Sequence, residues 1–150
     1  MVMTSVDRAM AAPPFCATAT VIRRLINTAD LVRWARAEGF ADLSPSAWHV
    51  TVILRVGDAE GMALDPSDLP VGPESARQVA RMDGVIALRF GSEALSARHA
   101  AYRTAGGFWA FNTYRPHVSF TPDDGRDLRQ VRPFGGALLF GPEVIDRGAI

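Results

Sequence analysis

Two histidines of this chain stand in the same short motif, each two residues before a hydroxyl side chain. The first motif is His49-Val50-Thr51 and the second is His117-Val118-Ser119. Imidazole titrates near neutral pH, so a histidine can accept or donate a proton in a reaction at pH 7. A hydroxyl can donate a hydrogen bond to an oxygen on which negative charge develops. Together these residue types suit acid–base chemistry at a phosphoryl group.

Both motifs lie in apolar, β-branched segments that are typical of strands. Residues i and i+2 share one face of a strand, so each histidine should share a face with its hydroxyl while the valine between them packs inward. Two such units facing each other could hold one phosphodiester, with one histidine as base and the other as acid, and no metal is needed. The motifs leave open which histidine does which. The alternative is a pair of half-buried strand histidines with polar neighbours.

The elements around the first motif can be predicted from residue types. Residues 19–26 form an expected strand, and Thr28 or Asn27 should cap a helix whose apolar face carries Leu31, Trp34 and Ala35. A second strand, residues 48–54, holds the first motif. Residues 57–75 are rich in Gly and Pro without a period and predict a long loop, a kind of segment that is often functional.

The same order of elements follows around the second motif. Asp83-Gly84 predicts a tight hairpin between strands 78–82 and 85–90. Ser92 should cap a helix from residue 93 to about 105, and residues 117–121 form the strand with the second motif. Residues 137–140 and 143–145 predict a last strand, or a pair interrupted by Gly141-Pro142. The chain thus has twice the order of a strand, a helix and a strand that carries a histidine motif. This order predicts an α+β fold of duplicated halves.

Composition restricts the function classes. The chain has 150 residues, 48% of them hydrophobic, which fits one folded domain at 18–150 after a flexible tail at 1–17. Formal net charge is zero, which argues against a general electrostatic grip on long nucleic acid or on a membrane. All 16 basic residues are arginine, so no lysine nucleophile exists. The lone Cys16 excludes a disulfide framework within the chain and a cysteine-based metal cluster. No leader or membrane-spanning run is visible, so a cytoplasmic protein is expected.

The two motifs, in this order of elements, resemble the 2H phosphoesterases, whose signature is two His-x-Thr/Ser motifs on a duplicated α+β fold. A closer similarity is to the phage anti-CBASS phosphodiesterases, which degrade bacterial cyclic nucleotide signals. It rests on residues 27–35, 48–52, 94–99, 114–119 and 140–143. The resemblance implies two lobes around a central cleft, with His49, Thr51, His117 and Ser119 as catalytic residues. It also implies no cofactor and a cyclic di- or trinucleotide substrate, cleaved at 3′–5′ linkages in the host bacterial cytoplasm.

Four further residues are candidates for substrate binding. By the resemblance Glu143 accepts from a nucleobase edge; the alternative is a surface glutamate. Arg98 orients either a phosphate or Glu143. Tyr114 and Trp109 could stack a base, although aromatic residues beside a strand more often belong to the core. His99, next to Arg98, is expected to be solvated or to lie behind the site.

Two other functions remain open at this stage. The same site could open a 2′,3′-cyclic phosphate on RNA, although a neutral chain fits a small ligand better than a long RNA. The chain could also be a nucleotide-binding module that sequesters its ligand without cleaving it. Paired acid and base residues favour the enzyme, because binding alone does not require them. Base preference, ring size and oligomeric state are not determined by the sequence.

Overall fold

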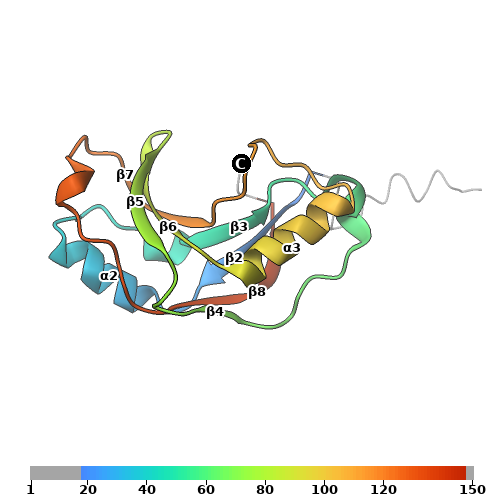
Figure 1. Ribbon diagram of the computed structural model, residues 1–150, viewed down its shortest axis with the longest axis horizontal. Coiled ribbons are helices and arrows are strands. Elements are labelled where there is room, and N and C mark those ends of the chain that lie inside the picture. Colours follow the sequence, from blue (N-terminus) through green and yellow to red (C-terminus); the bar gives the residue numbers. More distant parts are fainter. Residues whose placement is uncertain (1–17, 148–150) are drawn as a thin grey trace, which may run out of the picture.

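The computed structural model describes residues 18–147, so the tail expected at 1–17, with Cys16, lies outside the described residues. Two antiparallel sheets make up most of the fold (Figure 1). The first has the order β3-β2-β8-β4, formed by His49–Ile53, Thr20–Leu25, Leu138–Asp146 and Leu69–Val71. The second has the order β5-β6-β7, formed by Arg77–Met82, Val85–Phe90 and His117–Pro122. The expected α+β class with repeated strand-helix-strand units, β2-α2-β3 and β6-α3-β7, is confirmed.

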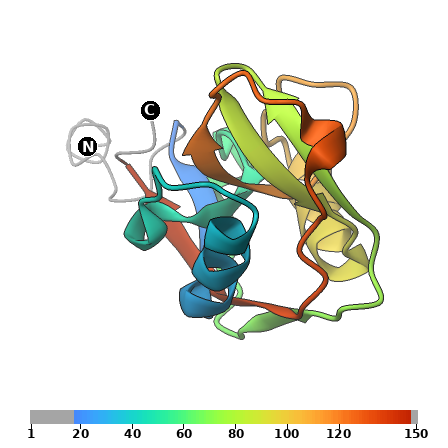
Figure 2. The same ribbon diagram turned by 90° about the vertical axis from the view of Figure 1, so that its left-hand side faces the viewer.

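Each α-helix connects two strands of one sheet and packs against the other sheet. The two α-helices are α2 (Thr28–Ala37) and α3 (Glu93–Thr104), with 3₁₀ turns η1 (Pro45–Ala47), η2 (Gly57–Gly61) and η3 (Leu128–Gln130). Trp34 of α2 packs edge-on against Phe120 of β7, with ring centroids 5.1 Å apart. In α3, the ring Nδ1 of His99 lies 2.8 Å from the carbonyl oxygen of Val52 in β3. Figure 2 shows the two sheets next to each other, and β3 and β7 are in contact.

Two local signals of the sequence are confirmed in detail. Asp83 and Gly84 both have positive φ, 49° and 87°, as the central residues of a type I′ turn require, and Met82 pairs with Val85 across it. The Ser92 hydroxyl accepts a hydrogen bond from the Leu95 amide at 3.1 Å and so caps α3.

The start of α2 differs from the expectation. Asn27 occupies the N-cap position, but its side chain accepts no hydrogen bond from the helix. Its amide nitrogen instead donates to Asp30 and to the carbonyl of Ala137, and its oxygen accepts from the Leu139 amide. The side chain of Asn27 therefore connects the start of α2 to the start of β8. These bonds to the strand use the side-chain atoms that would otherwise cap the helix.

One strand assignment from the sequence is wrong, and one that was left open is decided. The segment expected as a loop contains β4, where Leu69 pairs with Phe140 of β8. β4 has only three residues with a proline at the centre, too few to show the alternating hydrophobic pattern of a strand. At the end of the chain, the single last strand is confirmed over the interrupted pair, because β8 runs through Gly141-Pro142 without a break. These two residues lie opposite the single residue Arg24, because Glu143 pairs with Arg23 and Phe140 with Leu25. The extra residue forms a β-bulge, where proline is tolerated.

No helix among residues 18–147 is both long and apolar enough to cross a membrane.

The aromatic contact between α2 and β7 is expected to be a main source of stability. Phe120 is 1% exposed and its ring meets both Trp34 and Phe40 edge-on, with centroids 5.1 and 5.0 Å away. Phe120→Ala should lower the free energy of unfolding by about 3–5 kcal/mol, measured by chemical denaturation. Phe111→Ala is the control, because Phe111 is 68% exposed and should change it little. Equal effects of the two variants would contradict this packing.

Candidate active site

The two histidine motifs lie on facing edges of the two sheets. β3 is an edge strand of the first sheet and β7 is an edge strand of the second, and the two strands are in contact. Along both strands the valine of the motif is fully buried, while each histidine is half-buried. Thr51 is half-buried and Ser119 is exposed. The predicted alternation, with histidine and hydroxyl on one accessible face, is confirmed.

The same backbone contact fixes both histidine rings. Nδ1 of His49 lies 2.8 Å from the carbonyl oxygen of Ala47, and Nδ1 of His117 lies 2.9 Å from that of Arg115. A carbonyl can only accept, so Nδ1 carries the hydrogen in each ring. Nε2 is then the nitrogen that exchanges a proton. Both halves of the fold thus present a histidine in the same tautomer, through a bond to the residue two positions earlier.

His117 lies in surroundings that disfavour its charged form. Burial is the largest cause and lowers its pKa below the usual histidine value. The hydrogen bond to Arg115 raises it, and the nearby charges of Arg89 and His49 lower it again. A histidine with a lowered pKa is neutral over a wider pH range, as a general base must be.

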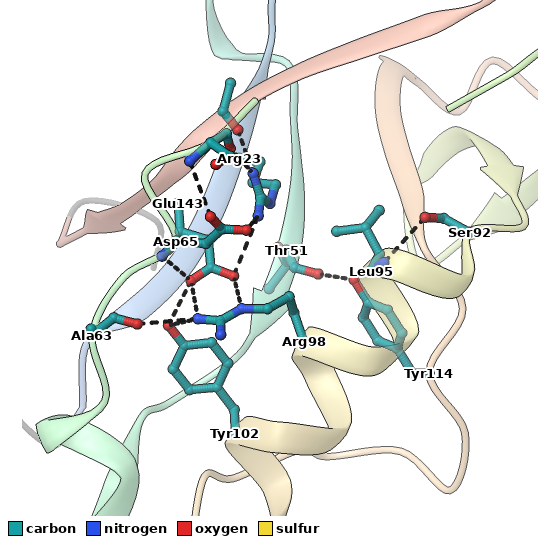
Figure 3. Close-up of polar contacts among 12 residues, drawn as sticks. Arg23, Thr51, Ala63, Asp65, Ser92, Leu95, Arg98, Tyr102, Tyr114 and Glu143 are labelled. Atoms are coloured by element: carbon teal, nitrogen blue, oxygen red, sulfur yellow. Dashed lines mark hydrogen bonds and ion pairs between the residues drawn. The ribbon is translucent and has the colours of Figure 1, made fainter. Parts of the chain in front are cut away.

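Tyr114 links the second half of the chain to the first motif. Its hydroxyl donates to the carbonyl of Thr51 at 2.7 Å (Figure 3). Its ring stacks on His99, with centroids 4.1 Å apart and planes 7° apart, and meets Trp109 edge-on. Burial raises the pKa of Tyr114, so the hydroxyl stays a neutral donor. Of the two readings that the sequence left open for Tyr114, this placement favours the core: one ring face is covered by His99.

His99 itself lies behind the motifs. It is 7% exposed and its Nδ1 contacts the carbonyl of Val52. Burial lowers its pKa, so the ring packs in its neutral form. Trp109, by contrast, lines a pocket of about 540 Å³ together with His117, Arg89 and the exposed Phe111. Base stacking by Trp109 therefore stays a prediction with a suitable location.

Glu143 and Arg98 meet in a buried ion-pair cluster, formed with Arg23, Asp65 and Tyr102 (Figure 3). Oε1 of Glu143 accepts from Arg98 at 2.6 Å, from the Tyr102 hydroxyl at 2.8 Å and from the Asp65 amide at 3.0 Å. Oε2 accepts from Nε of Arg98 at 2.7 Å. Arg23, whose side chain is 0% exposed, lies 3.7 Å from Oε2 and forms an ion pair with Asp65 at 2.7 Å.

This cluster excludes one of the alternatives that the sequence left open for Glu143. At 3% exposed, Glu143 is not a surface glutamate. Arg98 contacts Glu143 through two hydrogen bonds, and a role at a phosphate stays a prediction. Because both carboxylate oxygens bond to the chain itself, a nucleobase would have to replace one of these bonds, and that contact stays a prediction. Sequence reasoning missed Arg23; an arginine within an apolar strand was the available signal.

Among residues 18–147, no group of three or more His, Cys, Asp or Glu side chains could hold a metal ion.

Removing the charge of Glu143 should destabilise the fold. Glu143→Gln leaves Arg23 and Arg98 short of a carboxylate in a buried place, and breaking a buried pair in this way costs about 3–5 kcal/mol. The measurement is the free energy of unfolding by denaturant. The control is Asp30→Asn in the exposed Asp30–Arg33 pair, where a loss within about 1 kcal/mol is expected. If Glu143→Gln were as mild as its control, the cluster would not hold α3 to the first sheet.

Comparisons with known proteins show which family the chain belongs to. The family model described as anti-CBASS protein Acb1 matches residues 18–147. Curated relatives are the anti-CBASS protein Acb1 of Caulobacter sp. (strain RHG1), 38% identical over 136 residues, and that of Sphingomonas paeninsulae, 35% identical over 137 residues. These matches cover 84% and 83% of this chain, which spans only 22% of the length of each relative.

A solved structure described as a phosphoesterase superimposes with a TM-score of 0.60, covering 88% of this chain and 91% of that one at 14% identity. That likeness supports the fold alone. The expected resemblance is confirmed by the family match over nearly the whole described chain, and the chain belongs to the Acb1 anti-CBASS family.

Proposed function

We propose that this chain is a metal-independent phosphodiesterase that linearises cyclic di- or trinucleotide signals at 3′–5′ linkages and so counters bacterial CBASS immunity in the host cytoplasm. One observation carries the proposal: two histidines on facing strand edges, each fixed through Nδ1 and each sharing its face with a hydroxyl. The family membership supports the same activity.

The proposed reaction needs one proton acceptor and one proton donor on opposite sides of a phosphorus atom. With the adjacent ribose 2′-hydroxyl as nucleophile, O2′ bonds to phosphorus and the P–O5′ bond breaks. One Nε2 takes the proton of O2′ and the other gives a proton to O5′. An activated water attacking in place of O2′ makes the same demands. The lowered pKa of His117 favours it as the base. Thr51 and Ser119 donate to the nonbridging oxygens as their charge grows.

Substitution of either histidine should abolish most of the activity. His49→Asn and His117→Asn are the sharpest variants, because the amide nitrogen can keep the bond to the backbone carbonyl while Nε2 is lost. Each should lower the rate by about 10²–10⁴-fold, with little change in unfolding free energy. The assay is a panel of cyclic oligonucleotides incubated in excess EDTA and read by mass spectrometry.

Three outcomes of that assay would contradict the proposal. Near-full activity of either variant would contradict the assignment of the two histidines as a catalytic acid and base. Activity that EDTA abolishes and a divalent ion restores would replace the metal-free mechanism. Stoichiometric depletion of the cyclic nucleotide without product would make the chain a sequestering module instead.

The hydroxyl side chains should act as donors rather than nucleophiles. Residues i and i+2 of a strand lie about 7 Å apart along the chain, too far for a histidine to activate its own hydroxyl directly. Thr51→Ser and Ser119→Thr should be mild, because the donor is kept. Thr51→Val and Ser119→Ala should each lower the rate by about 10²–10³-fold. A covalent phosphoryl adduct on either residue, trapped during turnover and seen by mass spectrometry, would make that hydroxyl the attacking group.

A further inference from the structure

Each motif histidine has an arginine directly opposite it on the neighbouring strand. In the second sheet, Arg89 of β6 pairs with His117 of β7. In the first sheet, Arg24 of β2 pairs with His49 of β3. Directly opposite residues of an antiparallel pair point to the same face, with Cβ atoms about 4.5–5.5 Å apart. Because β3 and β7 are in contact, the strand order β6, β7, β3, β2 places the two histidines between the two arginines, and we call these four residues the row.

Arg89 is short of partners for its guanidinium. Its Nε is buried and has no hydrogen-bond partner among the described residues. Its one side-chain bond runs from Nη1 to Gln78, a neutral amide, at 3.3 Å. An unsatisfied buried donor destabilises a fold, and more so when the group is charged. Arg89 also lines the pocket beside His117. A cation kept in this state next to an accessible pocket fits an anionic ligand.

Arg24 has the matching position at the other end of the row. It is exposed, in contrast to its buried neighbours on β2, Arg23 and Leu25. Within residues 18–147 its side chain takes part in no hydrogen bond or ion pair. The bulge of β8 places Gly141-Pro142 opposite it, and neither residue carries a side chain that could neutralise the charge. Neither arginine is therefore neutralised by a carboxylate within residues 18–147, so both can attract an anionic ligand that spans the row.

We propose that Arg89 and Arg24 bind the phosphates that flank the scissile one, on the His117 side and the His49 side respectively. The inference rests on the proposed function, which places the scissile phosphate between the histidines. A guanidinium binds phosphate through two parallel hydrogen bonds, so each end of the row is suited to one phosphate. A cyclic trinucleotide has two phosphates besides the scissile one and engages both arginines. A nucleoside 2′,3′-cyclic phosphate has a single phosphate and engages neither.

Binding measurements with rings of different size test this assignment. Arg89→Gln and Arg24→Gln are compared with Arg36→Gln, an exposed arginine on α2, in a His49→Asn background that slows turnover. The probes are 3′,3′,3′-cyclic triadenylate and adenosine 2′,3′-cyclic phosphate, titrated by calorimetry. Each row variant should weaken triadenylate binding by roughly 10- to 100-fold, the effect of one lost bond to a charged group. Binding of the single-phosphate probe should stay unchanged, and the control variant should leave both unchanged.

Kinetics with His49 intact give a second readout that a structural role would not move. The row variants should raise KM for the triadenylate while kcat changes little, and Arg89→Lys should recover part of the loss because the charge is kept. Unchanged triadenylate binding in an active protein would overturn the inference and leave the proposed function standing. Ring binding that depends on the row, in a wild-type protein that cleaves no ring, would instead overturn the function alone. Equal losses of affinity for both probes would mean that these arginines stabilise the fold or bind the scissile phosphate. That result would overturn the inference.

Discussion

The distance between the two histidines depends on the packing of helices on sheets, because no hydrogen-bonded ladder joins β3 to β7. Each helix packs against the sheet to which its own neighbouring strands do not belong. Trp34 of α2 contacts Phe120 of β7, and His99 of α3 contacts the carbonyl of Val52 in β3. Tyr114 adds a hydrogen bond to the Thr51 carbonyl, in the middle of the first motif. The two half-sites are therefore held in register by contacts behind them, and the accessible face is left to polar side chains.

The Glu143 cluster shows how a charged group can serve that packing. It joins β8, β2, α3 and the segment at residues 63–67 through one buried carboxylate. Burying charges is costly unless they are paired and hydrogen-bonded, and every oxygen of Glu143 has such partners. The donors are forked guanidinium groups, which match a carboxylate in a way that the single charge of a lysine does not. Because every basic residue of this chain is arginine, every cation available to such a cluster has this forked geometry.

Sequence reasoning found the parts of the site that depend on local rules. Strand alternation placed His49 with Thr51 on one face, Asp83-Gly84 gave the hairpin, and Ser92 gave the helix start. It missed β4 and the side-chain bonds of Asn27, and it left open whether β8 is continuous, because each depends on a partner far away in the sequence. Burial of Glu143 and the opposition of Arg89 to His117 likewise require the pairing register, which one sequence does not reveal.

A net charge of zero excludes a positive electrostatic potential over the whole surface, but it does not exclude a local positive region. Several arginines are neutralised in place: Arg23 and Arg98 by the Glu143 cluster, and others in exposed pairs such as Arg126 with Asp124. The face that carries the histidines holds Arg24 and Arg89 opposite them in register, without an ion pair within the described part of the chain. A neutral protein can in this way present a positive row to a small anion while it offers no extended basic surface to long nucleic acid.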